Sequence, residues 1–151
     1  MNIMMLLEMA GGVFPDRPAF TDCSSGQSLT YAQLFEAARY RAASVRASGA
    51  ERLVKLDVSN LGTPLSLFTS AWAGVPYVPL NYRLTDTEIE ALLKRVTPAY
   101  LVTQAERAVR LGGLDGVLPV SSAAFLADNL HPHPVAEEWS MDPDEIAVLL
   151  F

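Results

Sequence analysis

The order of expected elements in this 151-residue chain predicts an α/β fold, a partial doubly wound, mainly parallel sheet with helices on both faces. Short apolar segments suited to strands alternate with segments of helical periodicity between residues 52 and 120. A strand, a helix and a further strand in succession require crossover connections, and these connections produce parallel strands. The expected strands 77–80 and 99–103 are apolar without strict alternation, as strands are when helices cover both faces of a sheet.

The first third of the chain is expected to form two helices and a hairpin. The ranges are a helix over 3–10, hairpin strands over 19–23 and 27–30, and a helix over 30–48. Thr30 and Gln33 have the spacing of a capping box, in which each residue satisfies a backbone donor at the start of the helix. Gly49 is expected to end this helix, because glycine readily adopts the left-handed conformation found after a helix.

The following segments supply the sheet and its crossovers. The expected elements are strands over 52–59, 77–80, 99–103 and 116–120, with helices over 64–72 and 85–97. Pro64 suits the first turn of a helix, and Gly74 suits a helix end. Thr85 and Glu88 form a second capping box, and Pro98 ends that helix.

The segment 58–82 has no charged residue and is long enough to span a bilayer. It contains three prolines and two glycines, and a proline inside a helix costs about 3 kcal/mol. The segment therefore predicts a buried helix, a turn and a buried strand.

Composition limits the partners and the compartment. A net charge of −6 argues against nucleic acid or an anionic membrane as a partner. Cys23 is the single cysteine, so no disulfide can form within the chain, and a cytoplasmic location is expected. The first twelve residues carry Glu8 and no basic residue, which is unlike a signal peptide.

No motif in the chain marks an active site or a metal site. The two common glycine-rich phosphate-binding patterns, G-x-G-x-x-G and G-x-x-x-x-G-K-[ST], do not occur. His131 and His133 lie among prolines without a third metal ligand nearby, and the acidic residues between 137 and 145 fit a solvated connection. No catalytic residue and no metal ligand is therefore assigned.

The expected organisation is an α/β subdomain over 1–128, an acidic, proline-containing linker over 129–145, and the start of a strand over 146–151. Residues 121–145 are expected to form a variable loop.

Three segments resemble successive landmarks of the adenylate-forming enzymes, the AMP-binding superfamily. They are SLTYAQLFEAA (28–38), AWAGVPYVPLNYRLTDTEIEALLKRVTPAYLVT (71–103) and DPDEIAVLLF (142–151). The resemblance is closest to the fatty acyl-CoA synthetases, also called fatty-acid–CoA ligases. In such enzymes a strand like 146–151 leads into a phosphate loop rich in Thr, Ser and Gly. The resemblance therefore implies that this chain is the N-terminal part of a larger ligase.

The resemblance implies a reaction that needs residues beyond this chain. Family members use ATP to activate a carboxylic acid as an acyl-adenylate, here with fatty acids favoured, and then transfer the acyl group to coenzyme A. ATP, Mg²⁺ and coenzyme A are the expected cofactors of the whole protein, and the 151-residue chain alone is expected to be inactive and to bind none of them. Two alternatives remain open: an adenylation domain that loads a carrier protein, and a non-enzymatic binding or assembly module.

Arg83 is the single candidate for a ligand contact. It follows the strand 77–80, and ligands of open α/β sheets bind beyond the carboxyl ends of strands. The resemblance implies that Arg83 contacts the nucleotide phosphate of coenzyme A; the alternative is a solvated surface residue. Arg39, Arg41 and Arg46 are expected to be solvated on the polar side of their helix.

Two further features of the sequence lead to expectations about packing. Lys55 and Asp57 interrupt a strand that is nearly all apolar in the family, so they must pair, lie near an end or edge of the sheet, or mark divergence from a functional ancestor. The apolar segment 146–151 is expected to leave an unpaired strand edge through which the chain self-associates.

Overall fold

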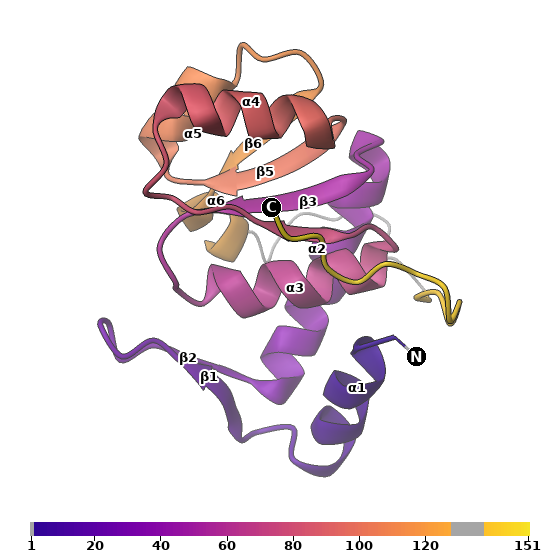
Figure 1. The fold of residues 1–151 in the computed structure, drawn as a ribbon. Coiled ribbons are helices and arrows are strands. Elements are labelled where there is room, and N and C mark those ends of the chain that lie inside the picture. The colour runs from indigo at the N-terminus through magenta and orange to yellow at the C-terminus, as the bar shows by residue number, and fades with distance from the viewer. Residues whose placement is uncertain (1, 128–137) are drawn as a thin grey trace.

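A computed structural model describes residues 2–127 and 138–151 of the chain (Figure 1). In chain order the elements are α1 (Met4–Val13), β1 (Pro18–Thr21), β2 (Ser28–Thr30), α2 (Tyr31–Ser48), β3 (Arg52–Leu56), α3 (Gly62–Ala73), β4 (Tyr77–Pro79), α4 (Asp86–Val96), β5 (Ala99–Thr103), α5 (Ala105–Leu111), β6 (Val117–Ser121) and α6 (Ser122–Ala127). The expected segment 58–82 forms α3 and β4, and no helix within the described ranges is long and apolar enough to cross a membrane.

The main sheet has four strands in the order β4-β3-β5-β6, and all of its pairings are parallel. β1 and β2 form a separate antiparallel pair, as expected for the hairpin. The predicted fold class is thereby confirmed.

Two apolar clusters lie on opposite faces of the sheet. The first joins side chains of α1, α2, α3 and α6 to Leu53 and Tyr100, while the second joins those of α4 and α5 to Val54 and Leu101. Neighbouring residues of β3 and β5 thus enter different clusters, because successive side chains of a strand point to opposite faces. Helices cover both faces, which explains why these strands lack an alternating polar pattern.

Local signals in the sequence define ends of α2 and α4. Both predicted capping boxes are present: Thr30 with Gln33 begins α2, and Thr85 with Glu88 begins α4. Gly49 ends α2 at φ +71°, in the left-handed region where a side chain would be strained.

The structure contains two short helices that the sequence did not reveal, α5 and α6. α6 lies inside the segment that was expected to be a loop, so that expectation was wrong for Ser122–Ala127. Its first turn is stabilised by Ser121, whose Oγ accepts a hydrogen bond from the Ala124 N–H at 3.1 Å. Phe125, which is 1% exposed, anchors the helix in the first cluster. One buried aromatic residue is too little to produce a helical period.

Residues 138–151 form an extended strap that reaches the outer edge of β4. Tyr77 donates its N–H to the carbonyl of Ala147 and accepts from the N–H of Leu149, both at 2.9 Å, which gives one parallel bridge at Val148. The side chains of Ile146 and Leu150 are 55% and 78% exposed.

The predicted subdomain and linker boundaries stay predictions, and His131 and His133 lie outside the described residues.

Candidate functional site

The carboxyl ends of β3 and β5 flank the point where the order of the strands in the sheet reverses. The chain leaves β3 for β4 on one side, whereas it leaves β5 for β6 on the other. Thr103, the last residue of β5, donates its hydroxyl hydrogen to the carbonyl of Leu56 at 2.6 Å. This bond links the carboxyl ends of β5 and β3. In open α/β folds, ligands bind beyond the carboxyl edge at such a point. The residues at this edge are therefore the candidate site.

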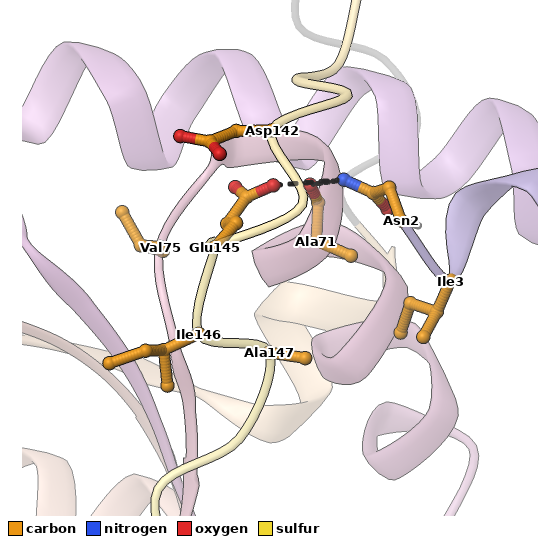
Figure 2. A pocket seen from close by; sticks show the side chains of 8 residues that line it. All are labelled: Asn2, Ile3, Ala71, Val75, Asp142, Glu145, Ile146 and Ala147. Carbon is orange, nitrogen blue, oxygen red and sulfur yellow. Dashed lines mark hydrogen bonds between the residues drawn. The ribbon is translucent and has the colours of Figure 1, made fainter.

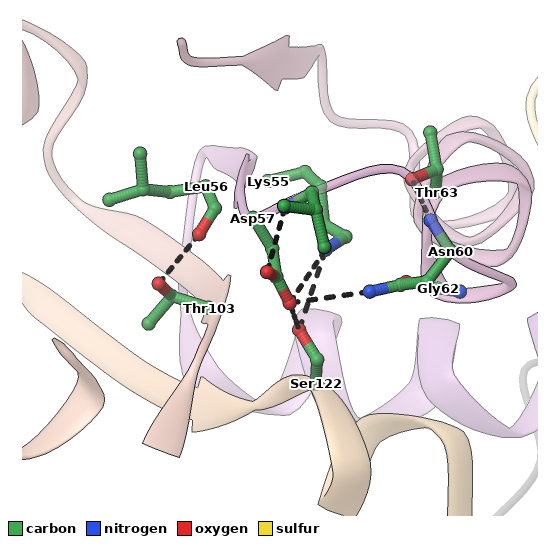
Figure 3. A network of polar contacts seen from close by, with 9 residues as sticks. Lys55, Leu56, Asp57, Asn60, Gly62, Thr63, Thr103 and Ser122 are labelled. Carbon is green, nitrogen blue, oxygen red and sulfur yellow. Dashed lines mark hydrogen bonds and ion pairs between the residues drawn. The ribbon is translucent and has the colours of Figure 1, made fainter. Parts of the chain in front are cut away.

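A polar network occupies this edge of the sheet, directly after β3 (Figure 3). The ammonium of Lys55 lies 3.4 Å from Oδ2 of Asp57, and these side chains are only 3% and 4% exposed. The same carboxylate oxygen accepts from the Ser122 hydroxyl at 2.6 Å and from the Asn60 amide at 3.3 Å. Asn60 also accepts from the Gly62 N–H at 2.9 Å, which links the network to the start of α3.

Burial and pairing both affect the pKa values of Lys55 and Asp57, but burial dominates for Lys55 and pairing for Asp57. Burial lowers the pKa of Lys55 and outweighs the charge of Asp57, which favours the protonated amine. Burial alone would raise the pKa of Asp57, but the hydrogen bond from Ser122 and the charge of Lys55 together hold that pKa below its usual value. At neutral pH the carboxylate is therefore ionised.

The network is internal, and it connects elements. Of the three outcomes expected for Lys55 and Asp57, the structure shows two, because the side chains pair and both residues lie at the carboxyl end of β3. Ser122 and Asn60 were not recognised from the sequence as members of this network. The network joins β3, the loop before α3 and the start of α6, so it fixes the shape of the carboxyl edge.

Arg83 lies beyond the carboxyl end of β4, the strand next to β3, and its side chain is exposed. The guanidinium carbon of Arg83 is 5.5 Å from the centre of the Tyr82 ring, and the backbone N–H of Arg83 donates to Oδ1 of Asn81 at 3.0 Å. None of the ion pairs among the described residues involves Arg83. Asn81 thus holds the backbone of this turn, and the guanidinium lies over the Tyr82 ring, where it is exposed to solvent.

The expectation that Arg41 is solvated was wrong. Arg41 is 2% exposed, and its guanidinium donates to the carbonyls of Phe125 and Leu126 at the end of α6. Arg46 is exposed but also bonded, since it donates to the carbonyls of Trp72 and Glu138. Both arginines hold segments of the chain together and are not available to a ligand.

Asn2 joins the strap to the body of the molecule (Figure 2). Its amide donates to the carbonyls of Ala71 and Ser140 at 3.0 Å each and lies 3.4 Å from Oε2 of Glu145. Its own oxygen accepts from the N–H of Met4 at the start of α1. The cavity between these segments has a volume of about 20 Å³, room for about one water molecule. The cavity is too small for a substrate, and Asn2 is a structural link.

Replacing Asn2 with alanine is expected to loosen the strap. Each lost hydrogen bond is worth about 1 kcal/mol, so hydrogen exchange at the amides of Tyr77 and Leu149 should become about five- to tenfold faster. The matched control is Asn81→Ala, at an exposed asparagine. Unchanged exchange at those amides, or an equal rise throughout the core strands, would show that Asn2 does not hold the strap.

The described residues contain no group of three or more His, Cys, Asp or Glu side chains arranged to hold a metal ion. At the carboxyl edge of the sheet, the candidate site offers the exposed guanidinium of Arg83 beyond β4 and the polar network around Asp57 at the end of β3. Such an edge is suited to an anionic group of a larger ligand.

The fold and this edge place the chain in a class of α/β proteins that bind ligands at the carboxyl ends of parallel strands. Residues 7–151 match the family of AMP-binding enzymes. The chain therefore belongs to the AMP-binding, adenylate-forming family. A comparison with curated proteins gives no significant match.

Solved structures share the fold over nearly the whole chain. VinN in complex with L-aspartate aligns with a TM-score of 0.84 at 22% identity, covering 98% of this chain and 40% of VinN. The benzoate CoA ligase of Burkholderia xenovorans aligns at 0.80 and 19% identity, over 98% of this chain and 32% of the ligase. The fatty acyl CoA synthetase of Mycobacterium tuberculosis aligns at 0.78 and 20% identity, over 99% and 32%. The chain thus spans about a third to two fifths of these structures.

Proposed function

We propose that this chain is the N-terminal part of an ATP-dependent acid–thiol ligase, which converts a carboxylic acid, with fatty acids favoured, into an acyl-coenzyme A. The observation that supports the proposal most is the family match over residues 7–151. The fold shared with proteins described as a fatty acyl CoA synthetase and a benzoate CoA ligase agrees with it.

The proposed reaction proceeds by two displacements. A carboxylate is a poor electrophile at neutral pH, so it must first be activated. In the proposal one carboxylate oxygen attacks the α-phosphorus of ATP, which is supplied as its Mg²⁺ complex, and pyrophosphate leaves. The thiol of coenzyme A then attacks the carbonyl carbon of the acyl-adenylate, and AMP leaves. This chain contributes Arg83, whose exposed guanidinium has the planar shape that suits phosphate. In the proposal Arg83 binds the nucleotide phosphate of coenzyme A, and the network around Asp57 fixes the edge beside it.

The test uses the longer protein that begins with this chain. We expect acid-dependent exchange between ATP and labelled pyrophosphate, measured with a fatty acid, benzoate and aspartate, followed by loss of the free thiol when coenzyme A is added. No exchange with any of the acids would contradict the proposal.

The 151-residue chain alone is expected to give no exchange above a control without enzyme. The reason is that the residues assigned to nucleotide binding in the family lie downstream of the matched segments. Acid-dependent exchange by the purified 151-residue chain would overturn this expectation.

The second candidate is an adenylation domain that loads a carrier protein. It is favoured by the structural similarity to VinN, which was solved with an amino acid, L-aspartate. Transfer of the activated acid to a phosphopantetheinylated carrier, without transfer to coenzyme A, would identify this class. The absence of any adenylation would leave the third reading, a binding or assembly module on the same fold.

We also propose that the isolated chain self-associates through residues 146–151. Val148 bridges to β4 on one side, whereas Ile146, Leu150 and Phe151 are more than half exposed. An unpaired apolar edge is a template for another chain. Ile146→Lys/Leu150→Lys should reduce the mass measured by sedimentation equilibrium, and an unchanged mass would contradict the proposal.

A further inference from the structure

The turn that carries Arg83 has a central peptide group that is bonded on both sides. The N–H of Leu84 donates to the carbonyl of Asn81 at 3.2 Å and closes the turn. The central peptide group joins Tyr82 to Arg83. Its N–H donates to Oδ1 of Asn81 at 3.0 Å, and its carbonyl accepts from the guanidinium of Arg107 at 2.9 Å. The N–H and the carbonyl lie in one plane, so these two bonds together hold that plane in one orientation.

Arg107 belongs to α5, a helix that is attached to the sheet at both ends. α5 begins two residues after Thr103, whose hydroxyl bonds to the carbonyl of Leu56 at the end of β3. At the other end of α5, Leu111 is 4% exposed and packs in the second cluster. Arg107 is half-buried between these two ends. The bond from Arg107 therefore ties the turn after β4 to the body of the sheet.

The conformation of this turn affects where the Arg83 guanidinium can lie. The backbone dihedral angles of a residue decide which of its side-chain rotamers are allowed. The contact between the guanidinium and the Tyr82 ring is exposed to solvent, and an exposed contact of this kind is weak. A fixed backbone under Arg83 restricts the side chain further. It reduces the freedom that Arg83 would lose on binding an anion, and this reduction strengthens binding.

Arg110 provides a contrast on the same helix. It lies three residues after Arg107, on the same face of α5, and its guanidinium lies 2.7 Å from Oδ2 of Asp86. The two side chains of this ion pair are 50% and 51% exposed, and exposed ion pairs contribute little. Asp86 is the first residue of α4 and lies outside the turn. Arg110 thus carries the same charge as Arg107 without a bond to the central peptide group.

We propose that Arg107 is a positioning residue for the anion site at Arg83. It holds the peptide group between Tyr82 and Arg83, and thereby keeps the Arg83 guanidinium in the orientation that binds a phosphate. The inference rests on the proposed function, in which this phosphate belongs to coenzyme A. Arg107 acts on the binding of coenzyme A through Arg83 and makes no contact with the ligand.

The first experiment uses the longer protein that begins with this chain. Arg107→Met keeps an apolar stem and removes the donors, so it should raise the KM for coenzyme A about five- to tenfold, the effect of one lost hydrogen bond. The kcat and the acid-dependent pyrophosphate exchange should stay unchanged. Arg110→Met is the matched control, which removes the same charge and should leave the KM unchanged. Arg107→Lys keeps a donor and should give an intermediate KM.

A double-mutant cycle separates positioning from direct contact. In an Arg83→Ala background, Arg107→Met should have no further effect on the KM for coenzyme A, because its effect passes through Arg83. Two effects that multiply independently would overturn the proposal, since Arg107 would then contact the ligand or support the fold in general. Equal KM values in Arg107→Met and Arg110→Met would also overturn it.

The second experiment does not depend on the ligase reaction. In the 151-residue chain, Arg107→Met should speed hydrogen exchange at the Arg83 amide about fivefold relative to Arg110→Met, because the central peptide group loses one of its two bonds. Unchanged exchange at the amides of β5 checks that the sheet remains folded. Equal exchange at the Arg83 amide in both variants would contradict the positioning role. A longer protein that forms no acyl-coenzyme A would instead contradict the proposed function, and the exchange at Arg83 would still decide whether Arg107 holds the turn.

Discussion

Replacing Asp57 with alanine is expected to lower the free energy of unfolding by about 3–5 kcal/mol, because removing one partner of a buried ion pair leaves the other charge uncompensated. Lys55 is 3% exposed and would lose its counter-ion, and Ser122 would lose the acceptor of its 2.6 Å hydrogen bond. Urea denaturation of the chain measures the loss. Asp115→Ala, at an exposed aspartate, is the matched control and should change the stability little.

A second variant separates the charge effect from the loss of packing. Lys55→Met/Asp57→Asn removes both charges and keeps a polar partner for Ser122, so it should recover most of the lost stability. The pKa of Asp57 is held below its usual value of 3.8, so its contribution is present above that pH and is lost as the pH falls further. Asp57→Ala should lack this part of the acid sensitivity. Equal losses in the single and double variants would contradict the electrostatic explanation.

Replacing Arg83 with alanine in the longer protein is expected to raise the KM for coenzyme A by one to two decades and to leave acid-dependent pyrophosphate exchange unchanged. A hydrogen bond to a charged group is worth about 1.5–3 kcal/mol, which sets this range. The separation of the two readouts follows from the proposed role, because adenylation precedes the binding of coenzyme A in the proposed sequence. Steady-state thiol consumption and pyrophosphate exchange measure the two steps.

Two further arginine variants sharpen this test. Arg83→Lys keeps the charge but loses the planar fork, so an intermediate KM is expected. Arg39→Ala, on α2, removes an arginine that pairs with Glu36 at 3.7 Å and should leave both readouts unchanged. A KM for coenzyme A that is the same in Arg83→Ala and in the unaltered protein would return Arg83 to the solvated surface.

The parts of the fold that were predictable are those encoded by neighbouring residues. Thr85 and Glu88 are three positions apart, and their side chains meet because a helix begins there. The apolar strands β3 and β5 predicted a sheet covered on both faces, since that property depends on composition within each strand. The pairing partners in the sheet follow from these crossovers with few alternatives.

Contacts between distant segments explain what could not be predicted. Arg41 lies on a helix whose local pattern marks it as polar, but its acceptors are carbonyls of α6, more than eighty residues away. Asp57 stood out because it interrupts an apolar strand, whereas Ser122 was hidden in a segment without periodicity. Arg83 could be placed at the carboxyl end of β4 from the sequence, but a ligand for it cannot be derived from the turn that holds it.

The position of β3 has a consequence for the order in which the chain acquires its structure. β3 is the first strand of the main sheet to be synthesised, yet it lies between β4 and β5. On the ribosome, β3, α3 and β4 can close as a local unit, since domains form as their segments emerge. The other edge of β3 then stays open until β5 has been made. We expect this nascent intermediate to be the state most prone to wrong pairing, and hence the one that a chaperone would shield.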